Sequence, residues 1–372
     1  MSAINAAGPA ASSTAARAGT VLAIDGGNSK TEIALVDDAG RVIARARSGA
    51  FTPQSSGVAA AVAVAAEGVA DLRRQLGLRP GVPLARHLAA YVAGADLPVE
   101  EDALALAFAA EGWADSAEVG NDTFALLRAG ATRPYAVAVV CGAGINCAGI
   151  GPDGRRARFL ALGRISGDWG GGGYLGSEAL WHAMRGEDGR GPATALGPAV
   201  TAHFGTRTVE EVALALHFGE LPEARLHGLS PVLMATAEAG DPVALGVVGR
   251  LAEEVVTMAR VALARLDLMA APIEMVLGGG VLQAQIPVLM QGIRERAAVE
   301  VPLAEIVVVT EPPVRGAALL GLDSLRKAEE AGGAVEAAGA GEVGPAGRAD
   351  QVGQAGQVGQ VDQVDQVDQV SQ

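Results

Sequence analysis

Three glycine-rich turns are the parts of this 372-residue sequence best suited to hold a phosphate. The first lies within residues 137–149 (VAVVCGAGINCAG), where an apolar strand runs into Gly142-Ala143-Gly144 and then resumes an extended pattern. The others are residues 25–31 (DGGNSKT) and Gly278-Gly279-Gly280, and each also follows a short apolar strand. Glycines leave backbone amides open to an anion because no side chain blocks its approach. The three turns together predict a site for nucleotide phosphates.

The turn at residues 25–31 carries an aspartate where a carboxylate could face a magnesium ion. Asp25 ends the strand, and the glycines after it let a hairpin fold over phosphates while Asp25 holds Mg²⁺ directly or through water. Taken alone, the stretch is equally typical of an ordinary tight turn, and Lys30 is equally consistent with a solvated side chain. The triple glycine at 278–280 would let an adenine ring pack directly against the backbone. A flexible loop is the alternative interpretation of these three glycines.

The net charge and the cysteine and histidine content of the chain argue against several kinds of partner and site. The net charge of -14 argues against nucleic acid and anionic membranes as partners, because both would be repelled. Cys141 and Cys147 lie in one short segment and cannot form a disulfide framework, and the five histidines have no zinc spacing. No uncharged apolar run reaches roughly 18 residues, so we expect a cytoplasmic protein. The oligomeric state stays open, with a homodimer among the options.

The pattern of apolar runs and turns predicts an α/β fold built from two similar halves. In the first half it predicts strands at 21–24, 31–36, 41–47, 88–93 and 118–119, with helices at 58–76 and 99–111. This order of meander, helix, strand, helix and strand is that of a ribonuclease-H-like domain. In the second half it predicts strands at 135–141, 145–150, 158–163, 273–277 and 306–310, with helices at 241–268 (the longest), 288–298 and 315–325. Two such halves facing each other would form a cleft.

The turns DGGNSKT, CGAGINC and LGGG, with residues 313–318 (PVRGAA) leading the last helix, resemble the actin-like ATPase superfamily. Within it the chain is most similar to the BadF/BadG/BcrA/BcrD ATPase group, which includes N-acetylglucosamine kinase and actinobacterial glucosamine kinases. The resemblance covers about residues 20–326 and implies Mg²⁺-ATP as the phosphoryl donor. It implies that ATP contacts Gly26, Gly27, Asn28, Lys30, Thr31, Gly142, Ala143, Gly144, Gly278, Gly279 and Gly280.

The resemblance also implies a domain organisation. We expect a disordered lead at residues 1–19, and an N-terminal actin-like domain made of residues 20–121 together with 313–326. Residues 122–312 would form the C-terminal actin-like domain. From residue 327 the chain turns to Ala, Gly, Glu, Gln and Val and ends in QVGQVDQVDQVDQV, which predicts a disordered acidic tail to residue 372.

Polar residues at predicted strand ends are candidates for binding and activating the acceptor. Asn121-Asp122-Thr123 matches the segment that supplies the catalytic aspartate in these kinases, so Asp122 would accept the proton of the attacking sugar hydroxyl. From the residues alone, the favoured reading of Asp122 is a cap for the helix at 123–128, and the family match reverses that preference. Asp96 also follows a strand and is either a fallback base or, as we prefer, a sugar ligand. The full predicted acceptor set is Asp96, Asn121, Asn146, Asp168 and Gln54.

Two of these positions carry the match to amino-sugar kinases. Asn146 resembles a sugar-binding amide of N-acetylglucosamine kinases, and Asp168 matches the aspartate of their Gly-Asp-Glu-Gly-Ser segment. A carboxylate can accept hydrogen bonds from two neighbouring sugar hydroxyls. Alternatively, Asp168 organises the glycine loop around it.

Some residues differ from the family pattern, and these differences help to indicate which sugar accepts the phosphoryl group. Trp169 and a run of glycines replace Glu-Gly-Ser, and residues 50–54 (AFTPQ) stand where some relatives carry Asn-x-Trp, so Trp169 becomes a candidate for lining the sugar pocket. A partly cationic free amino sugar would seek carboxylates, which Asp96, Glu100, Glu101, Asp122 and Asp168 offer. Residues 167–172 (GDWGGG) and 181–185 (WHAMR) resemble the actinobacterial glucosamine kinases, and this resemblance implies phosphorylation of glucosamine to glucosamine 6-phosphate. The alternatives are an N-acetylglucosamine kinase, or an ATPase or regulator of this family that phosphorylates no sugar.

Overall fold

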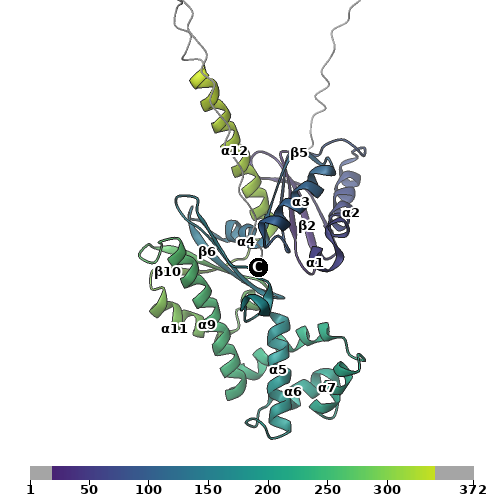
Figure 1. Ribbon diagram of the computed structural model, residues 1–372, viewed down its shortest axis with the longest axis vertical. Coiled ribbons are helices and arrows are strands. Elements are labelled where there is room, and N and C mark those ends of the chain that lie inside the picture. Colours follow the sequence, from purple (N-terminus) through teal and green to yellow (C-terminus); the bar gives the residue numbers. More distant parts are fainter. Residues whose placement is uncertain (1–18, 340–372) are drawn as a thin grey trace, which may run out of the picture. The chain divides into compact units, whose positions relative to one another are not determined.

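The computed structural model describes residues 19–339 (Figure 1). The predicted disordered lead and most of the predicted acidic tail lie outside these residues. One five-stranded sheet has the order β3-β2-β1-β4-β5. Its strands are β1 (Val21–Gly26), β2 (Thr31–Val36), β3 (Val42–Ser48), β4 (Ala85–Val92) and β5 (Ala114–Asn121). The first three run antiparallel, and β4 and β5 then join parallel to β1.

The second sheet repeats this plan with the order β10-β9-β6-β7-β8. Its strands are β6 (Ala136–Cys141), β7 (Ile145–Ile150), β8 (Arg156–Arg158), β9 (Ile273–Gly278) and β10 (Ala304–Val308). Strands β6, β7 and β8 form an antiparallel meander, and β9 and β10 join parallel to β6. The strand order confirms the predicted duplication and the two-part actin-like α/β fold.

Helices cover both sheets. Helices α1 (Pro53–Ser56), α2 (Val58–Leu76) and α3 (Pro98–Ala110) connect strands of the first sheet. Helix α4 (Asp122–Gly130) follows β5 and packs against both sheets. Helix α2 buries Ala61, Ala65, Val69 and Leu72, which share one face at helical spacing. It ends at Gly77, whose φ of 64° suits a left-handed C-cap. Both ends of α2 therefore follow the sequence prediction.

A long helical insertion separates β8 from β9. It comprises α5 (Gly172–Glu187), α6 (Leu196–Phe204), α7 (Val209–His217), the 3₁₀ segment Glu223–Gly228, α8 (Leu229–Glu238) and α9 (Pro242–Arg265). The remaining helices are α10 (Gly280–Gln283), α11 (Pro287–Glu300) and α12 (Pro313–Gly339). Asp241 caps α9 by accepting from the amides of Val243 and Ala244, with Pro242 at the first helical position. Figure 1 shows α9 and α11 beside the second sheet.

A shared apolar core joins the two sheets through α4 and the first turns of α12. Phe124 and Leu127 of α4 pack with Ala23 of β1, Ala138 of β6 and Ala317 of α12. The end of β5 and the start of α4 are thereby fixed relative to both glycine hairpins. Residues 121–123, where the candidate base lies, are part of this fixed junction.

Three sequence predictions are corrected. The third strand of the second meander is Arg156–Arg158 rather than 158–163, and residues Gly163–Ser166 form a 3₁₀ turn. The physical reason is Asp168, whose carboxylate accepts from the Gly163 amide and the Ser166 hydroxyl and closes a loop there. Helix α9 ends at Arg265, and α12 is longer than α9 because it continues to Gly339. Strand β10 begins at Ala304, two residues before the predicted start.

One further finding concerns membranes. Within residues 19–339 no single helix is both long and apolar enough to cross a bilayer. The bent pair Glu223–Glu238 and Pro242–Arg265 passes that test by length and composition alone.

Candidate active site

The first glycine turn links β1 to β2. It is closed by the Gly27 amide donating to the carbonyl of Lys30 at 2.8 Å. The Lys30 ammonium pairs with Glu32, and the Thr31 hydroxyl donates to the carbonyl of Gly49 at 2.9 Å. Of the polar side chains predicted to contact ATP here, Lys30 and Thr31 are therefore already bonded within the protein.

The second and third glycine turns lie against each other. The amide of Gly142 donates to the carbonyl of Gly144 at 2.9 Å, which forms the tight turn between β6 and β7. Gly279 has a φ of +82°, and a Cβ there would stand 2.5 Å from the carbonyl carbon and oxygen of Cys141. The structure thus brings together the two turns predicted from residues more than a hundred positions apart.

The start of α5 completes this arrangement, which the sequence reasoning missed. The Gly172 amide donates to the Gly142 carbonyl at 2.7 Å. Gly171 has a φ of +87°, and a Cβ on it would lie 2.4 Å from the Cα of Gly144. The run Gly170 to Gly173 is the signal for it in the sequence, although its match to the family places it in the sugar loop. The N-terminus of a 16-residue helix therefore joins the glycine turns, where the positive end of the helix dipole favours an anion.

The carboxylates of Asp25, in the first glycine turn, and Asp122, at the start of α4, are close enough for their charges to interact. Burial, repulsion from Asp122 and repulsion from Glu32 raise the pKa of Asp25 to about 8, with Lys30 acting in the opposite direction. Burial raises the pKa of Asp122 to about 6, and hydrogen bonding from Thr123 opposes that rise. Buried carboxylates with raised pKa values are typical of sites that handle protons or cations.

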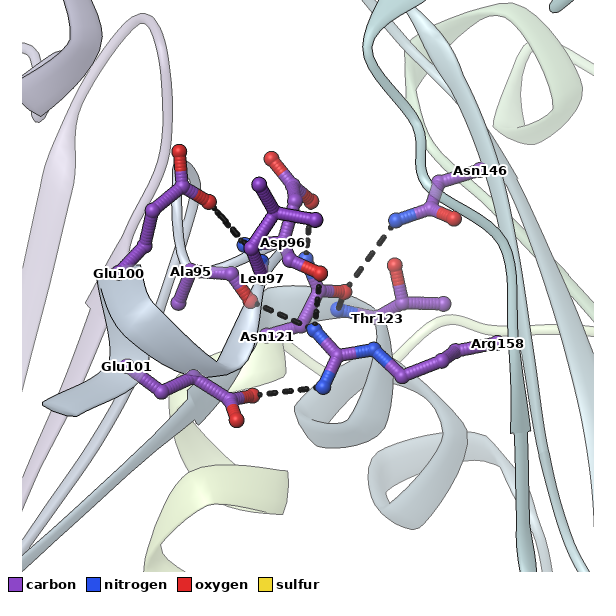
Figure 2. A network of polar contacts seen from close by, with 9 residues as sticks. All are labelled: Ala95, Asp96, Leu97, Glu100, Glu101, Asn121, Thr123, Asn146 and Arg158. Atoms are coloured by element: carbon purple, nitrogen blue, oxygen red, sulfur yellow. Dashed lines mark hydrogen bonds and ion pairs between the residues drawn. The ribbon is translucent and has the colours of Figure 1, made fainter. Parts of the chain in front are cut away.

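Asn121 is the centre of a polar network shown in Figure 2. Its amide donates to the Asp96 carboxylate at 2.7 Å, and its oxygen accepts from the Thr123 amide at 3.0 Å. The Asn146 amide also donates to that oxygen, at 3.3 Å. Asn121 is therefore the residue that caps α4, and Asp122 is not. The alternative reading of Asp122 as a helix cap is wrong, because its neighbour already fills that role.

Asp96 lies at the mouth of an acceptor-side cavity of 490 Å³, which it lines with Leu97, Pro98, Arg158, Phe159, Leu160, Ser166, Asp168 and Arg265. Burial and repulsion from Asp122 and Glu100 raise the pKa of Asp96 to about 7, while Arg158 lowers it. Asp168 lines this cavity, and its carboxylate accepts from the Gly163 amide and the Ser166 hydroxyl of its own loop. Its role as a sugar ligand stays a prediction. The structure brings together Asp96, Asn121 and Asn146 by direct bonds, and Asp96 and Asp168 by the cavity.

Two further predicted residues do not line this cavity. Gln54 is exposed and stands against the loop that carries Asp96, where a Cβ on Gly94 would meet its amide at 2.4 Å. Trp169 does not line the acceptor-side cavity but a separate one of 450 Å³ between α5 and α9, with the Arg250 guanidinium 4.4 Å from its ring. Because Trp169 is 4% exposed, its ring belongs to the core of the second half. That Trp169 lines the sugar pocket stays a prediction.

Stability should depend on pH because the buried acids are protonated more readily in the folded chain. The pKa values of Asp25, Asp96 and Asp122, about 8, 7 and 6, exceed the ordinary 3.8. Their stabilising contribution is complete below pH 3.8 and is lost as the pH rises through 6 to 8. Asp25→Asn should remove the part that is lost between pH 3.8 and about 8. We expect the variant's melting temperature to fall roughly 5 °C less than that of the wild type between pH 5 and 8.5, without nucleotide.

Scanning fluorimetry of both proteins over this pH range checks the prediction. Asp102→Asn, which alters an exposed carboxylate on α3, is the control and should follow the wild-type curve. Parallel curves for wild type and Asp25→Asn would contradict the assignment of Asp25 as a buried, destabilising carboxylate.

Two sheets of the same strand order, each with a glycine turn at the end of its central strand, define the actin-like ATPase class of fold. The chain belongs to the BadF/BadG/BcrA/BcrD ATPase family, whose sequence model matches residues 22–321. This confirms the family inferred from the glycine turns.

The relatives of the chain are sugar kinases. It is 25% identical over 317 residues to an N-acetyl-D-glucosamine kinase of Dictyostelium discoideum, which covers 82% of this chain and 98% of the relative. It is 23% identical over 262 residues to an N-acetylmuramic acid/N-acetylglucosamine kinase of Clostridium acetobutylicum, covering 70% of this chain and 85% of the relative. A crystal structure from Chromobacterium violaceum, solved as a candidate N-acetylglucosamine kinase, shares the fold with a TM-score of 0.65 at 23% identity, over 81% of this chain and 98% of that one.

Proposed function

We propose that the protein transfers the γ-phosphoryl group of ATP to the 6-hydroxyl of an amino sugar. The observation that carries this proposal is the position of Asp122. Its charge raises the pKa values of Asp25 in the first glycine turn and of Asp96 in the acceptor-side cavity. A base at that junction can reach a hydroxyl on one side and a phosphoryl group on the other. The sugar-kinase relatives and the family match support the same reading.

In this mechanism Asp122 accepts the proton of the sugar hydroxyl as that oxygen attacks phosphorus in line with the leaving ADP. Amides of the glycine turns and of the α5 N-terminus bind the phosphates and stabilise their charge. Asp96 and Asp168 accept hydrogen bonds from sugar hydroxyls, and Asn146 donates to the sugar after releasing Asn121. Holding both reactants in place supplies much of the rate, because it removes the entropy cost of their encounter.

Asp25 is the residue that would hold Mg²⁺. Among residues 19–339 no group of three or more His, Cys, Asp or Glu forms a metal cluster, so most ligands would come from phosphates and water. Asp25 fits such a role, because a largely buried carboxylate repelled by Asp122 and Glu32 gains from a nearby cation. The ion would neutralise charge on the β- and γ-phosphates.

The charges of the acceptor-side cavity bear on which amino sugar is used. Of the five carboxylates expected to attract an ammonium group, Glu100 accepts the amides of Asp96 and Leu97, and Glu101 pairs with Arg158. Asp96, Asp122 and Asp168 remain. Of these, Asp96 and Asp168 line the acceptor-side cavity, and Arg158 and Arg265 line it with them. This balance favours a neutral acetamide over an ammonium group.

We therefore infer N-acetylglucosamine as the first candidate acceptor, in agreement with the activities named for the two relatives. Glucosamine is the second candidate, because Asp96 and Asp168 still offer two carboxylates. The purified protein should release ADP from Mg²⁺-ATP and form a sugar 6-phosphate only when an amino sugar is added. Parallel assays with N-acetylglucosamine, glucosamine, glucose and no sugar, following ADP and sugar phosphate separately, rank the acceptors.

A higher kcat/KM for glucosamine would reverse the order of the two candidates. Hydrolysis that proceeds equally without sugar would instead favour an ATPase or regulator of this family, and would contradict the kinase proposal.

A further inference from the structure

Arg158 ends β8 in the second half of the molecule, and its side chain contacts the loop after β4 in the first half (Figure 2). One terminal nitrogen, Nη2, donates to the carbonyls of Ala95 and Asp96 at 2.9 and 2.6 Å. The other, Nη1, pairs with the Glu101 carboxylate of α3 at 3.0 Å. The two ends of one guanidinium therefore engage two backbone acceptors and one carboxylate of the opposite half.

We propose that Arg158 is a positioning residue that clamps the loop carrying Asp96 onto β8 and so sets the closure of the acceptor side of the site. The inference rests on the proposed function in one respect, that Asp96 binds the acceptor. An arginine suits the task because its planar fork donates in several fixed directions, whereas a lysine ammonium is a point charge on a flexible stem.

The surroundings of Asp96 explain why the clamp matters. Its amide is held by Glu100 at 3.0 Å and its carboxylate by Asn121 at 2.7 Å, and both partners belong to the first half of the chain. Its carbonyl is held by Arg158 from the second half. Of the four polar contacts in Figure 2 that join the two halves, Arg158 makes three and Asn146 makes the fourth, at 3.3 Å.

Arg158 is itself held in place by the second half. The Arg265 guanidinium donates to the Arg158 carbonyl at 2.9 Å and lies 4.5 Å from the ring of Phe159. The clamp thus connects a fixed strand end to the acceptor loop. Its loss would leave two carbonyls and the Glu101 carboxylate without this partner, and would let water into the cavity that Asp96 and Asp168 line.

The test compares Arg158→Gln and Arg158→Lys with the wild type, using Arg156→Gln on the same strand as the control. Arg156 is exposed and faces the Phe124 ring, so its replacement should leave sugar kinetics unchanged. Both Arg158 variants should raise the KM for the amino sugar about ten- to hundredfold while the KM for ATP changes less than threefold. They should also release more ADP per sugar phosphate formed, since water gains access.

A second measurement does not depend on turnover. Hydrogen exchange at residues 95–97, recorded without sugar or nucleotide, should be faster in Arg158→Gln than in the wild type or Arg156→Gln. Glu101→Gln, which keeps both carbonyl contacts, should give a smaller increase in KM and add nothing in the Arg158→Gln background. If the wild type phosphorylates no sugar, the proposed function fails, and exchange at this loop alone decides on the clamp.

Unchanged exchange in Arg158→Gln would overturn the clamp. So would faster exchange with an unchanged KM for the sugar, because the loop would then move without affecting the acceptor.

Discussion

Asp122→Asn should lower sugar-dependent turnover by about 10²- to 10⁴-fold, because the amide cannot take the proton of the attacking hydroxyl. The change keeps the size of the side chain and leaves Asn121 to cap α4. ATP binding should therefore stay close to that of the wild type. The melting temperature should not fall, because the variant lacks a buried carboxylate whose ionisation costs stability. The measurement is the rate of sugar phosphate formation at saturating ATP and sugar. The control is Asp102→Asn, which should retain full activity.

The pH dependence of wild-type kcat/KM tests the role of Asp122 independently. Asp122 acts as a base only when ionised, and its pKa is raised to about 6. We expect kcat/KM to fall tenfold for each unit of pH below about 6. A variant that keeps more than a tenth of wild-type turnover, or a profile flat down to pH 5, would show that another group takes the proton.

Gly171→Ala should abolish most ATP-dependent turnover, by about 100-fold or more, because it displaces the second glycine turn. The added Cβ would lie 2.4 Å from the Cα of Gly144 and 2.5 Å from the carbonyl oxygen of Ala143, so backbone must move. A shift of about 1 Å in a positioning group can cost that much in rate. The KM for ATP and the melting temperature should change with the rate.

Gly57→Ala is the matched control for this prediction. Gly57 precedes α2 with φ 84° and ψ 156°, close to the 87° and 158° of Gly171 before α5, but a Cβ there meets nothing within 4 Å. It therefore carries only the strain of this glycine conformation, about 1–3 kcal/mol of stability, and should leave the KM for ATP unchanged. If the two variants lose the same turnover, strain in the loop explains the effect and the contact with Gly144 does not.

The features that the sequence predicts well are the ones encoded locally. The meanders, the strand order of the two halves and the glycine turns follow from short apolar runs and from glycine, whose conformational needs are visible residue by residue. Even so, the run after Arg158 resembles a strand and is not one, because Asp168 bonds back to Gly163 and Ser166. That bond depends on tertiary placement of the loop, which a local pattern does not contain.

The candidate site is less visible because its residues act through distant partners. Asn121 and Asp122 are both good helix caps, and only the backbone conformation at Asn121 decides which of them takes the Thr123 amide. Arg158 meets Ala95, Asp96 and Glu101 at separations of 57 to 63 residues, so no local spacing indicates the contact. The Trp169 ring packs against the Arg250 guanidinium of α9, a partner that the residues around Trp169 do not indicate.

The two cysteines flank the second glycine turn, and both side chains are free and buried. Burial raises the pKa of the Cys141 thiol to about 12 and that of Cys147 still further above its usual range. A thiol that stays protonated is a poor nucleophile and oxidises slowly. The sulfur atoms next to the nucleotide turn are thereby chemically silent, and peroxide or an alkylating reagent should reach them only when β6 and β7 separate. Inactivation by such reagents would measure local unfolding of the turn.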